Sequence, residues 1–388
     1  MTDRQSRRLR PLAVLLVAAA ALGVASTLPA SAAPSETGRR DAVRSGLELL
    51  VQQDRYPAAL AATTDGRGRT RDLTAGVGDL RTGSRVPVDG RVRAGSNTKT
   101  YTAVVVLQLV GEGKVELDAP IERHLPGLVR GEGIDGRAIT VRQLLQHTSG
   151  LPNYTDYIAA EVFGNHHRYY QPRELLDIAL AHKATSAPGT AWAYSNTNYV
   201  LAGLLIEKVT GRPYAEQITR RVIDRLGLRN TYFPAVGEET IRGAHPQGYH
   251  VAEPGAKPVD VTELDPSWGW AAGQLVSTPS DLNRFFAGLL NGRLLKPEQL
   301  AQMRTTVPMP TGPGGVAGER YGLGLISTPL SCGKVAWGHG GATPGSYTVP
   351  GVTEDGRAAT IAVTANLAPT RQGPEHVAAL LDSALCAG

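Results

Sequence analysis

The chain has 388 residues, of which 41% are hydrophobic and 19% charged, and its formal net charge is +5 at pH 7. This length suits one large domain or two that share a core, and this composition excludes intrinsic disorder. Two cysteines exclude a multi-bridge disulfide framework and a four-cysteine zinc site, and no Lys/Arg block beyond the N-terminus favours nucleic-acid binding.

The first 32 residues have the pattern of a secretory signal peptide. Four arginines lie within residues 4–10, an apolar stretch follows over 12–25, and Ala30-Ser31-Ala32 forms a small-x-small cleavage site. A membrane anchor is the alternative, but the stretch is shorter than the roughly 20 residues of a membrane span and ends at the cleavage site. We therefore expect cleavage near Ala32 and a secreted, extracellular protein without a membrane anchor.

Helices and strands are predicted at both ends of the mature chain. The first helix covers 40–53, where apolar side chains form one stripe. Strands are predicted over 57–64 and 70–78, on either side of the turn Asp65-Gly66-Arg67-Gly68. From Asn97 to Val110 the chain is apolar almost all round a helix, which is typical of a buried helix.

The rest of the chain divides into a helical middle and a strand-rich end. Residues 111–264 favour helices and long loops. The later elements predicted are strands at 320–327, 334–339, 344–350 and 357–365, the last two joined by the turn Asp355-Gly356, and a closing helix at 374–385. We therefore predict an α+β fold in which early and late strands form one antiparallel sheet flanked by helices.

The predicted export of the protein indicates the oxidation state of its two cysteines. Cys332 and Cys386 would meet an oxidising environment, where a cysteine pair usually bonds, so we expect one disulfide between them. The rival interpretation makes Cys332 a nucleophile, but its nearest histidine, His339, offers no obvious activating arrangement.

Ser96-Asn97-Thr98-Lys99 stands at the start of the predicted buried helix. Residues i and i+3 share one helix face, so Lys99 is expected beside Ser96. Burial favours a neutral lysine, which can accept the serine proton, and a helix N-terminus supplies N–H groups for a developing oxyanion. The alternative is that Ser96 only caps the helix. A second Ser-x-x-Lys, Ser331 to Lys334, lies at a turn before a strand and lacks this context.

Tyr194-Ser195-Asn196 could add a proton relay. The Tyr194 phenol can pass a proton to a leaving group if a lysine lies near, and the Asn196 amide can orient that lysine and a substrate carbonyl. Alternatively, Ser195, Asn196 or Thr197 caps a helix that runs to about Val209.

His339-Gly340-Gly341 ends a predicted strand. Glycines let backbone N–H groups approach a ligand closely, and His339 could face a substrate or hydrogen-bond Tyr194. The alternative is an ordinary strand end. His166-His167 do not share a face and predict no metal site, and the segment His147–Leu151 is interpreted as a structural helix stop.

The order of these motifs resembles the serine-type D-alanyl-D-alanine carboxypeptidases and class C β-lactamases. Further segments that carry the resemblance are Leu144–Leu151 (Leu-Leu-Gln-His-Thr-Ser-Gly-Leu), Tyr194–Tyr199, Ala271–Gly273, Ser277–Leu282 and Tyr321–Leu325. The resemblance covers nearly the whole mature chain and is closest to the secreted carboxypeptidases, including the two late cysteines.

The resemblance implies a β-lactamase/transpeptidase-like fold, with a sheet subdomain at about 33–110 and 265–388 and a helical subdomain at about 111–264. It implies that Ser96 is acylated, that Lys99 accepts its proton and that Tyr194 relays protons. The remaining implied site residues are Asn196 for the substrate amide, His339 where many relatives have Lys, and the backbone N–H groups of Ser96 and Ala342 for the oxyanion. Gly341 is implied as a substrate-binding residue, and Trp268 and Tyr170 as cleft-wall aromatics.

Two departures concern a substrate's terminal carboxylate. Ile326 stands where related carboxypeptidases can have an arginine, and Gly340 and Ala342 stand where hydroxyl residues can assist. We predict a secreted serine D-alanyl-D-alanine carboxypeptidase, a monomer that acts on peptidoglycan stem peptides, with β-lactams as inhibitors or substrates and no metal or cofactor. The alternatives are a β-lactamase, esterase or D-amino-acid amidase, and a catalytically silent peptidoglycan-binding or sensor protein.

Overall fold

Strands from the two ends of the chain form one antiparallel sheet. The computed structural model describes residues 36–387 apart from 254–255, 313 and 366–371, so the predicted signal peptide lies outside the described residues. The sheet order is β10-β11-β12-β13-β15-β16-β1-β2-β3, with β14 paired to β15. The strands are β1 (Ala58–Thr64), β2 (Thr70–Asp79), β3 (Ser84–Arg85), β10 (Val307–Pro308), β11 (Arg320–Tyr321), β12 (Ile326–Pro329), β13 (Val335–Gly338), β14 (Gly341–Thr343), β15 (Ser346–Thr353) and β16 (Ala358–Val363).

The junction of early and late strands lies inside the sheet, as the sequence predicts. β1 pairs with β2 on one side and with β16 on the other, so Ala61 lies opposite both Leu73 and Ile361. All six residues of β16 are buried, which explains why its sequence does not alternate between apolar and polar residues; the one polar side chain, Thr360, donates to Asn283 Oδ1 at 2.7 Å.

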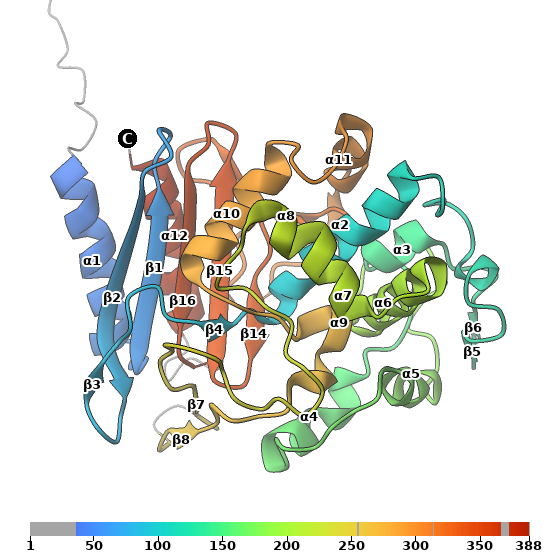
Figure 1. Cartoon of the computed structure of the whole chain (residues 1–388), viewed down its shortest axis with the longest axis horizontal. Helices are drawn as coiled ribbons and strands as arrows, with labels where there is room; N and C mark the ends of the chain where they lie inside the picture. The colour runs from blue at the N-terminus through green and yellow to red at the C-terminus, as the bar shows by residue number, and fades with distance from the viewer. Residues whose placement is uncertain (1–35, 254–255, 313, 366–371, 388) are drawn as a thin grey trace, which may run out of the picture. The chain divides into compact units, whose positions relative to one another are not determined.

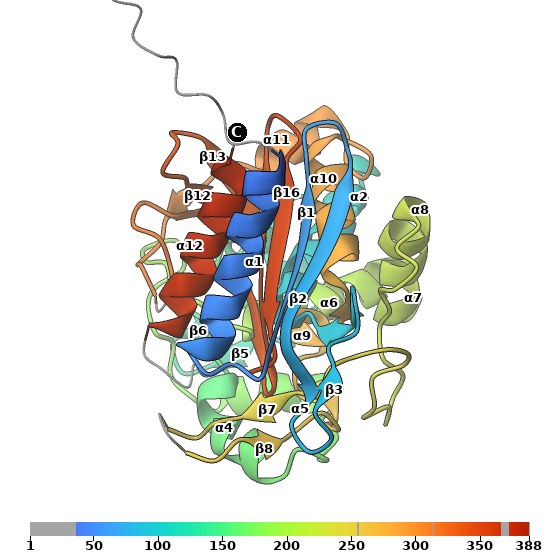
Figure 2. The same cartoon turned by 90° about the vertical axis from the view of Figure 1, so that its left-hand side faces the viewer.

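Two helices cover one face of the sheet. α1 (Glu36–Gln52) and α12 (Gly373–Cys386) lie side by side there (Figure 2) and bury Leu47, Leu50 and Leu381 against the strands. Their contact is close at Gly46, where an added Cβ would lie 2.3 Å from the side chain of Leu380. The predicted disulfide forms between Cys332 and Cys386, with 5.7 Å between their Cα atoms, and joins the end of α12 to the turn before β13.

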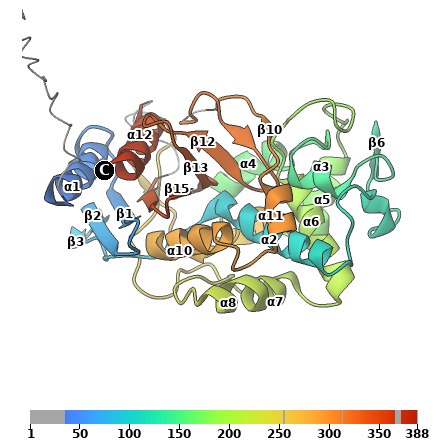
Figure 3. The same ribbon diagram turned by 90° about the horizontal axis from the view of Figure 1, so that it is seen from above.

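Helices also cover the other face. α10 (Pro279–Leu290) packs on β1, β15 and β16, and the sheet lies between α10 and the α1–α12 pair when seen from above (Figure 3). The buried helix α2 (Thr98–Gly111) follows, and it packs against α6 (Thr197–Thr210) and α9 (Trp270–Gly273) (Figure 1). Eleven of the fourteen residues of α2 are buried, as its apolar pattern predicts.

The remaining elements surround α2 and the sheet. The helices are α3 (Val141–Leu145), α4 (Thr155–Gly164), α5 (Pro172–Leu180), α7 (Tyr214–Ile218), α8 (Asp224–Leu226) and α11 (Pro297–Met303). Three two-stranded pairs are β4 (Val92–Arg93) with β9 (Val276–Ser277), β5 (Arg130–Gly131) with β6 (Ile134–Asp135), and β7 (Tyr249–His250) with β8 (Val259–Asp260). The short 3₁₀ helices are η1 (Gly95–Asn97), η2 (Ile121–Arg123) and η4 (Pro266–Trp268), and η3 (Thr219–Ile223) is a π-helix. The proposed boundaries of a sheet and a helical subdomain stay a prediction. No helix among the described residues is both long and apolar enough to cross a membrane.

The single strand predicted over 320–327 is wrong, because the chain turns between β11 and β12. Gly322 N–H donates to the carbonyl of Leu325 at 2.7 Å. Gly324 has φ +72°, and an added Cβ there would lie 2.7 Å from both Ala103 and the Tyr199 hydroxyl. Glycine therefore permits both the turn and its close approach to α2 and α6.

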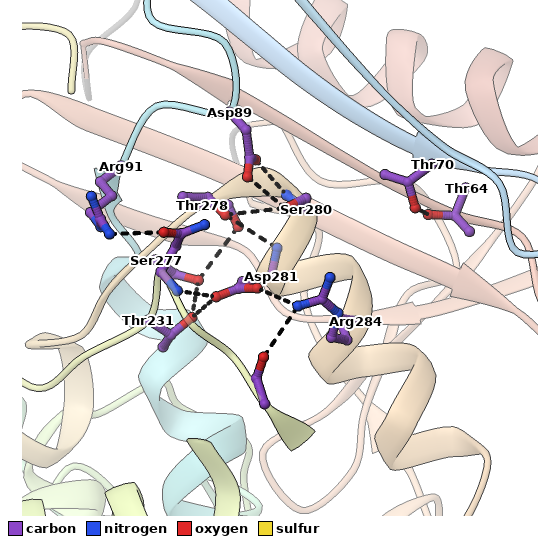
Figure 4. Close-up of polar contacts among 12 residues, drawn as sticks. Thr64, Thr70, Asp89, Arg91, Thr231, Ser277, Thr278, Ser280, Asp281 and Arg284 are labelled. Atoms are coloured by element: carbon purple, nitrogen blue, oxygen red, sulfur yellow. Dashed lines mark hydrogen bonds and ion pairs between the residues drawn. The ribbon is translucent and has the colours of Figure 1, made fainter. Parts of the chain in front are cut away.

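A polar network fixes the segment that pairs with the chain just before Ser96. The Asp89 carboxylate accepts hydrogen bonds from the N–H of Ser280 at 3.0 Å and from its hydroxyl at 2.6 Å (Figure 4). The Asp281 carboxylate accepts from the Thr231 hydroxyl at 3.0 Å, and Thr231 lies 2.8 Å from the hydroxyl of Ser277 in β9. Because β9 pairs with β4, the network holds the start of the site in place.

Candidate active site

Ser96 lies in η1, immediately before α2. Asn97 Nδ2 donates to the carbonyl of Ala94 at 2.8 Å and to the Thr348 hydroxyl at 2.7 Å, which ties the turn to β15. Gly95 has φ +53°, a left-handed conformation that favours glycine. The helix α2 begins at Thr98, after Ser96, so the alternative that Ser96 is its N-cap is wrong.

Lys99 is fully buried beneath Ser96. Its Nζ lies 2.9 Å from Ser96 Oγ, 2.6 Å from Asn196 Oδ1 and 2.8 Å from the carbonyl oxygen of Ala272. Burial lowers the pKa of Lys99 well below its usual value, because the charged form is desolvated. A neutral amine has two N–H groups for the two oxygens that can only accept, which leaves its lone pair for the proton of Ser96. The geometry therefore suits a lysine that acts as a base.

Tyr194 is the second side chain that contacts the Ser96 hydroxyl. Its hydroxyl donates to Ser96 Oγ at 2.8 Å, and Lys99 Nζ lies 4.9 Å from the centre of its ring. Burial raises the pKa of Tyr194, so the phenol keeps its proton and can pass it on. Serine, lysine and tyrosine thus share one chain of hydrogen bonds.

Asn196 orients the lysine and is itself held by two residues that the sequence analysis missed. Its Nδ2 lies 3.2 Å from Asn153 Oδ1 and 3.1 Å from Thr155 Oγ1. Since both N–H bonds have acceptors, Oδ1 is fixed toward Lys99. Asn196 makes no side-chain capping bond to α6, although it occupies the N-cap position. Asn153 and Thr155 follow the segment His147–Leu151 closely in the sequence. This proximity was the only indication in the sequence that they could lie near the site.

His339 is buried at the end of β13 and remains neutral. Its Nδ1 lies 2.6 Å from the carbonyl of Gly340, and its Nε2 lies 2.9 Å from the hydroxyl of Tyr321. Nδ1 therefore donates and Nε2 accepts. Burial, with a smaller contribution from Lys99, lowers the pKa of His339 to about 3. The hydrogen bond that we considered between His339 and Tyr194 is wrong, because His339 Nε2 accepts from the Tyr321 hydroxyl instead.

β14 lies directly against the turn that holds Ser96. A Cβ on Gly341 would lie 2.0 Å from the carbonyl oxygen of Ala94, and a Cβ on Gly95 would lie 2.7 Å from the backbone nitrogen of Ala342. Only glycines permit this approach. The contact brings the Ala342 backbone beside Ser96, where we predicted an oxyanion hole.

A pocket of about 420 Å³ opens above these groups. Its lining residues are Ser96, Tyr154, Thr155, Tyr194, Asn196, Trp268, Gly269, Ala272, Gly273, Ile326, His339, Gly340, Gly341, Ala342 and Tyr347. Trp268 lies in the wall, as predicted. Tyr170, which we predicted as a wall residue, is not among the described residues that line this pocket: it is buried, and its ring packs on Arg168. Tyr154 and Tyr347 supply the other aromatic walls.

His147 lies behind Tyr194, with 4.4 Å between their ring centres. Its Nδ1 accepts from the N–H of Ser195 at 3.2 Å and lies 3.0 Å from Asn198 Nδ2. His147 therefore supports the tyrosine segment, which agrees with its structural interpretation. Among the residues described, no group of three or more His, Cys, Asp or Glu side chains could hold a metal ion.

The sequence matches one protein family over most of its length. The Beta-lactamase family matches residues 40–385. Among curated proteins, Penicillin-binding protein 4 of Amycolatopsis lactamdurans is 28% identical over 308 residues, which are 77% of this chain and 74% of that protein.

Many solved structures share the fold. A D-stereospecific amidohydrolase from Streptomyces sp. has 40% sequence identity and a TM-score of 0.79, over 86% of this chain and 97% of that one. The D-amino acid amidase of Ochrobactrum anthropi has 27% identity and a TM-score of 0.77, over 89% and 98%. The octameric penicillin-binding protein homologue of Pyrococcus abyssi has 25% identity and a TM-score of 0.74, over 88% and 77%. The chain thus belongs to the β-lactamase family and is a serine hydrolase of the penicillin-recognising superfamily.

Proposed function

We propose that the protein is a D-stereospecific serine amidohydrolase that cleaves amides or esters of D-configured acyl groups. The observation that carries this proposal is an intact Ser96–Lys99–Tyr194 network beneath a pocket whose described lining has no lysine or arginine. Such a pocket suits a substrate without a terminal carboxylate. The similarity to the Streptomyces amidohydrolase and to the Ochrobactrum amidase supports the same class.

The D-alanyl-D-alanine carboxypeptidase predicted from the sequence is the second candidate. The similarity to Penicillin-binding protein 4 favours it. Ile326 lines the pocket where related carboxypeptidases can have an arginine, and a lost charge-assisted hydrogen bond weakens binding by roughly ten- to a hundredfold. The geometry therefore favours the amidohydrolase.

In the proposed reaction, Ser96 Oγ attacks the acyl carbonyl and its proton passes to Lys99. The N–H groups of Ser96 and Ala342 stabilise the oxyanion. Tyr194 donates its proton to the leaving amine or alcohol and regains one from Lys99, so the bond breaks and the acyl group stays on Ser96. Water then attacks the acyl-enzyme and gives its proton to the same pair, which releases the acid and restores Ser96.

We also propose that the enzyme acts outside the cell as a monomer, after removal of residues 1–32. The pattern of these residues and the disulfide between Cys332 and Cys386 support an extracellular location.

Turnover of matched substrates tests the proposal. Purified enzyme would be given D- and L-phenylalanine p-nitroanilide and, separately, a peptide that ends in D-alanyl-D-alanine. We expect nitroaniline release from the D-isomer alone, with little release of D-alanine, and no activity in Ser96→Ala. Faster release of D-alanine would favour the carboxypeptidase, and no turnover of any substrate would contradict both.

A further inference from the structure

A second pocket adjoins the catalytic pocket on the α12 face of the sheet. Its volume is about 190 Å³, and β12, β13 and β15 form one wall while α12 forms the other. It shares four lining residues with the catalytic pocket: Ile326, His339, Gly340 and Tyr347. We call it the side pocket. A ligand that extends past these four residues would leave one pocket and enter the other.

The side pocket is mostly apolar but contains a carboxylate. Val316, Leu330 and Val349 line it, together with Glu319. Glu319 Oε1 accepts a hydrogen bond from the Thr328 hydroxyl at 2.7 Å, and the backbone of Val316 also interacts with this carboxylate. The other acidic residue in the wall is Asp382. Both of its carboxylate oxygens accept hydrogen bonds from Ser331, one from the N–H at 2.7 Å and one from the hydroxyl at 2.6 Å.

Glu319 has no cationic partner among the described residues. Among the described residues that line the side pocket there is no lysine or arginine, and the neighbouring Arg320 extends to Thr306 instead. Burial raises the pKa of Glu319. A cation beside the carboxylate would lower that pKa again and offset the cost of burying the charge. The carboxylate is therefore suited to a ligand cation.

The charge distribution of the two pockets indicates where such a cation would lie on a substrate. The described lining of the catalytic pocket has no aspartate, glutamate, lysine or arginine, whereas the adjoining side pocket has the carboxylates of Glu319 and Asp382. Thr328 lies two residues beyond Ile326 on β12, a rise of roughly 6.6 Å. The cation would thus be separated from the cleaved bond by a long side chain or about two residues.

We propose that the side pocket binds a primary ammonium group on the leaving-group side of the substrate, through Glu319. The leaving-group side is part of the proposal, and it is tested with amides that carry the ammonium on their amine portion. This inference rests on the proposed function for the reaction that it serves. The substrate class is an amide whose amine portion carries a second, basic amine.

Two matched ligands test the assignment by direct binding. The D-phenylalanine amides of 1,5-diaminopentane and of hexylamine have the same number of heavy atoms and differ only in the terminal ammonium. Their dissociation constants would be measured by calorimetry at pH 8 on Ser96→Ala protein, which binds without turnover. We expect the diamine amide to bind roughly ten- to a hundredfold more tightly.

Glu319→Gln in the same background keeps the acceptor for Thr328 and should abolish the preference. Glu216→Gln, on α7 and outside both pockets, is the control and should keep it. Equal affinity in the parent protein, no binding of either ligand, or a preference that survives Glu319→Gln would overturn the inference. The comparison of the two ligands on Ser96→Ala protein tests the inference even if the Glu319→Gln variant does not fold.

Turnover by the wild-type enzyme separates this inference from the proposed function. If both D-amides are hydrolysed and bind with equal affinity, the proposed amidohydrolase activity is supported and the proposed ammonium site is contradicted. A preference for the diamine amide without hydrolysis of any D-amide would support the site and contradict the proposed reaction.

Discussion

Lys99 Nζ lies 2.9 Å from Ser96 Oγ, and no part of Lys99 is exposed to solvent. Because burial lowers the pKa of Lys99, the arrangement favours a neutral base that takes the serine proton directly. A base of this kind accounts for a rate factor of about 10²–10⁴.

Lys99→Arg should therefore lose roughly 10²–10⁴-fold in kcat/KM, since a guanidinium cannot accept a proton. The loss should lie mainly in kcat, measured by initial rates on a D-amino-acid nitroanilide. Lys208→Arg, an exposed residue of α6, is the control and should retain full activity. Substantial activity in Lys99→Arg would show that another group accepts the proton.

Penicillin should acylate Ser96 and no other serine. Intact-protein mass after incubation should show one adduct on the wild type and none on Ser96→Ala. Ser331→Ala is a matched control, because Ser331 also begins a Ser-x-x-Lys sequence but lies exposed at a turn. Following the free drug in the same tube identifies rapid hydrolysis, which would indicate β-lactamase activity where no adduct persists.

Local spacing predicted which side chains meet around Ser96, since Lys99 is one helical turn from Ser96 and the motif order resembled a known family. Spacing could not predict the partner of His339. Its hydrogen bond to Tyr321 depends on the turn that divides β11 from β12, and that turn depends on Gly324 packing against α2 and α6. The burial of Tyr170 is likewise a result of long-range packing, which no local pattern encodes.

The fold was predictable to a greater extent than the pocket walls. Apolar runs and turn signals gave β1, β2, β15 and β16 within a few residues, because each is long enough to show a pattern. β11 and β14 have two and three residues, and strands of this length leave no periodicity in a sequence.

Gly341→Ala should destabilise the protein and reduce activity, because the new Cβ would lie 2.0 Å from the Ala94 carbonyl oxygen. β14 would have to move away from Ser96, at a cost of more than about 2 kcal/mol. Gly340→Ala is the control for stability, since its Cβ would meet nothing nearer than 3.9 Å. Thermal unfolding of both variants shows whether the loss of stability comes from the contact with Ala94 or from alanine at any glycine of this segment. Equal melting temperatures of the two variants would contradict the predicted clash with Ala94.

Reduction of the disulfide between Cys332 and Cys386 should lower thermal stability. The bond closes a loop with a sequence separation of 54, which chain-entropy arguments value at roughly 4 kcal/mol. The double variant Cys332→Ser/Cys386→Ser should show the same loss and should no longer respond to a reductant. A reductant effect that persists in this variant would have another cause.

The stability of the protein should fall as the pH drops from about 6.5 toward 3, in part because of His339. The pKa of His339 is lowered from 6.5 to about 3 in the folded protein, so the unfolded chain binds the proton first. Stability from the neutral imidazole is fully present above pH 6.5 and is lost by about 1.4 kcal/mol per pH unit in the middle of that range. Urea unfolding at several pH values measures this slope.

His339→Gln should flatten the slope, since glutamine does not titrate. His245→Gln is the control, because His245 is partly exposed and its Nδ1 lies 2.7 Å from the carbonyl of Gly243 in the same loop. Because His339 is neutral in the folded protein, its titration should not change kcat/KM near pH 6.5. In a plot of kcat/KM against pH, the decrease on the acidic side should therefore lie at the same pH in His339→Gln as in the wild type. A decrease that moves with His339→Gln would mean that the histidine is charged in the working enzyme.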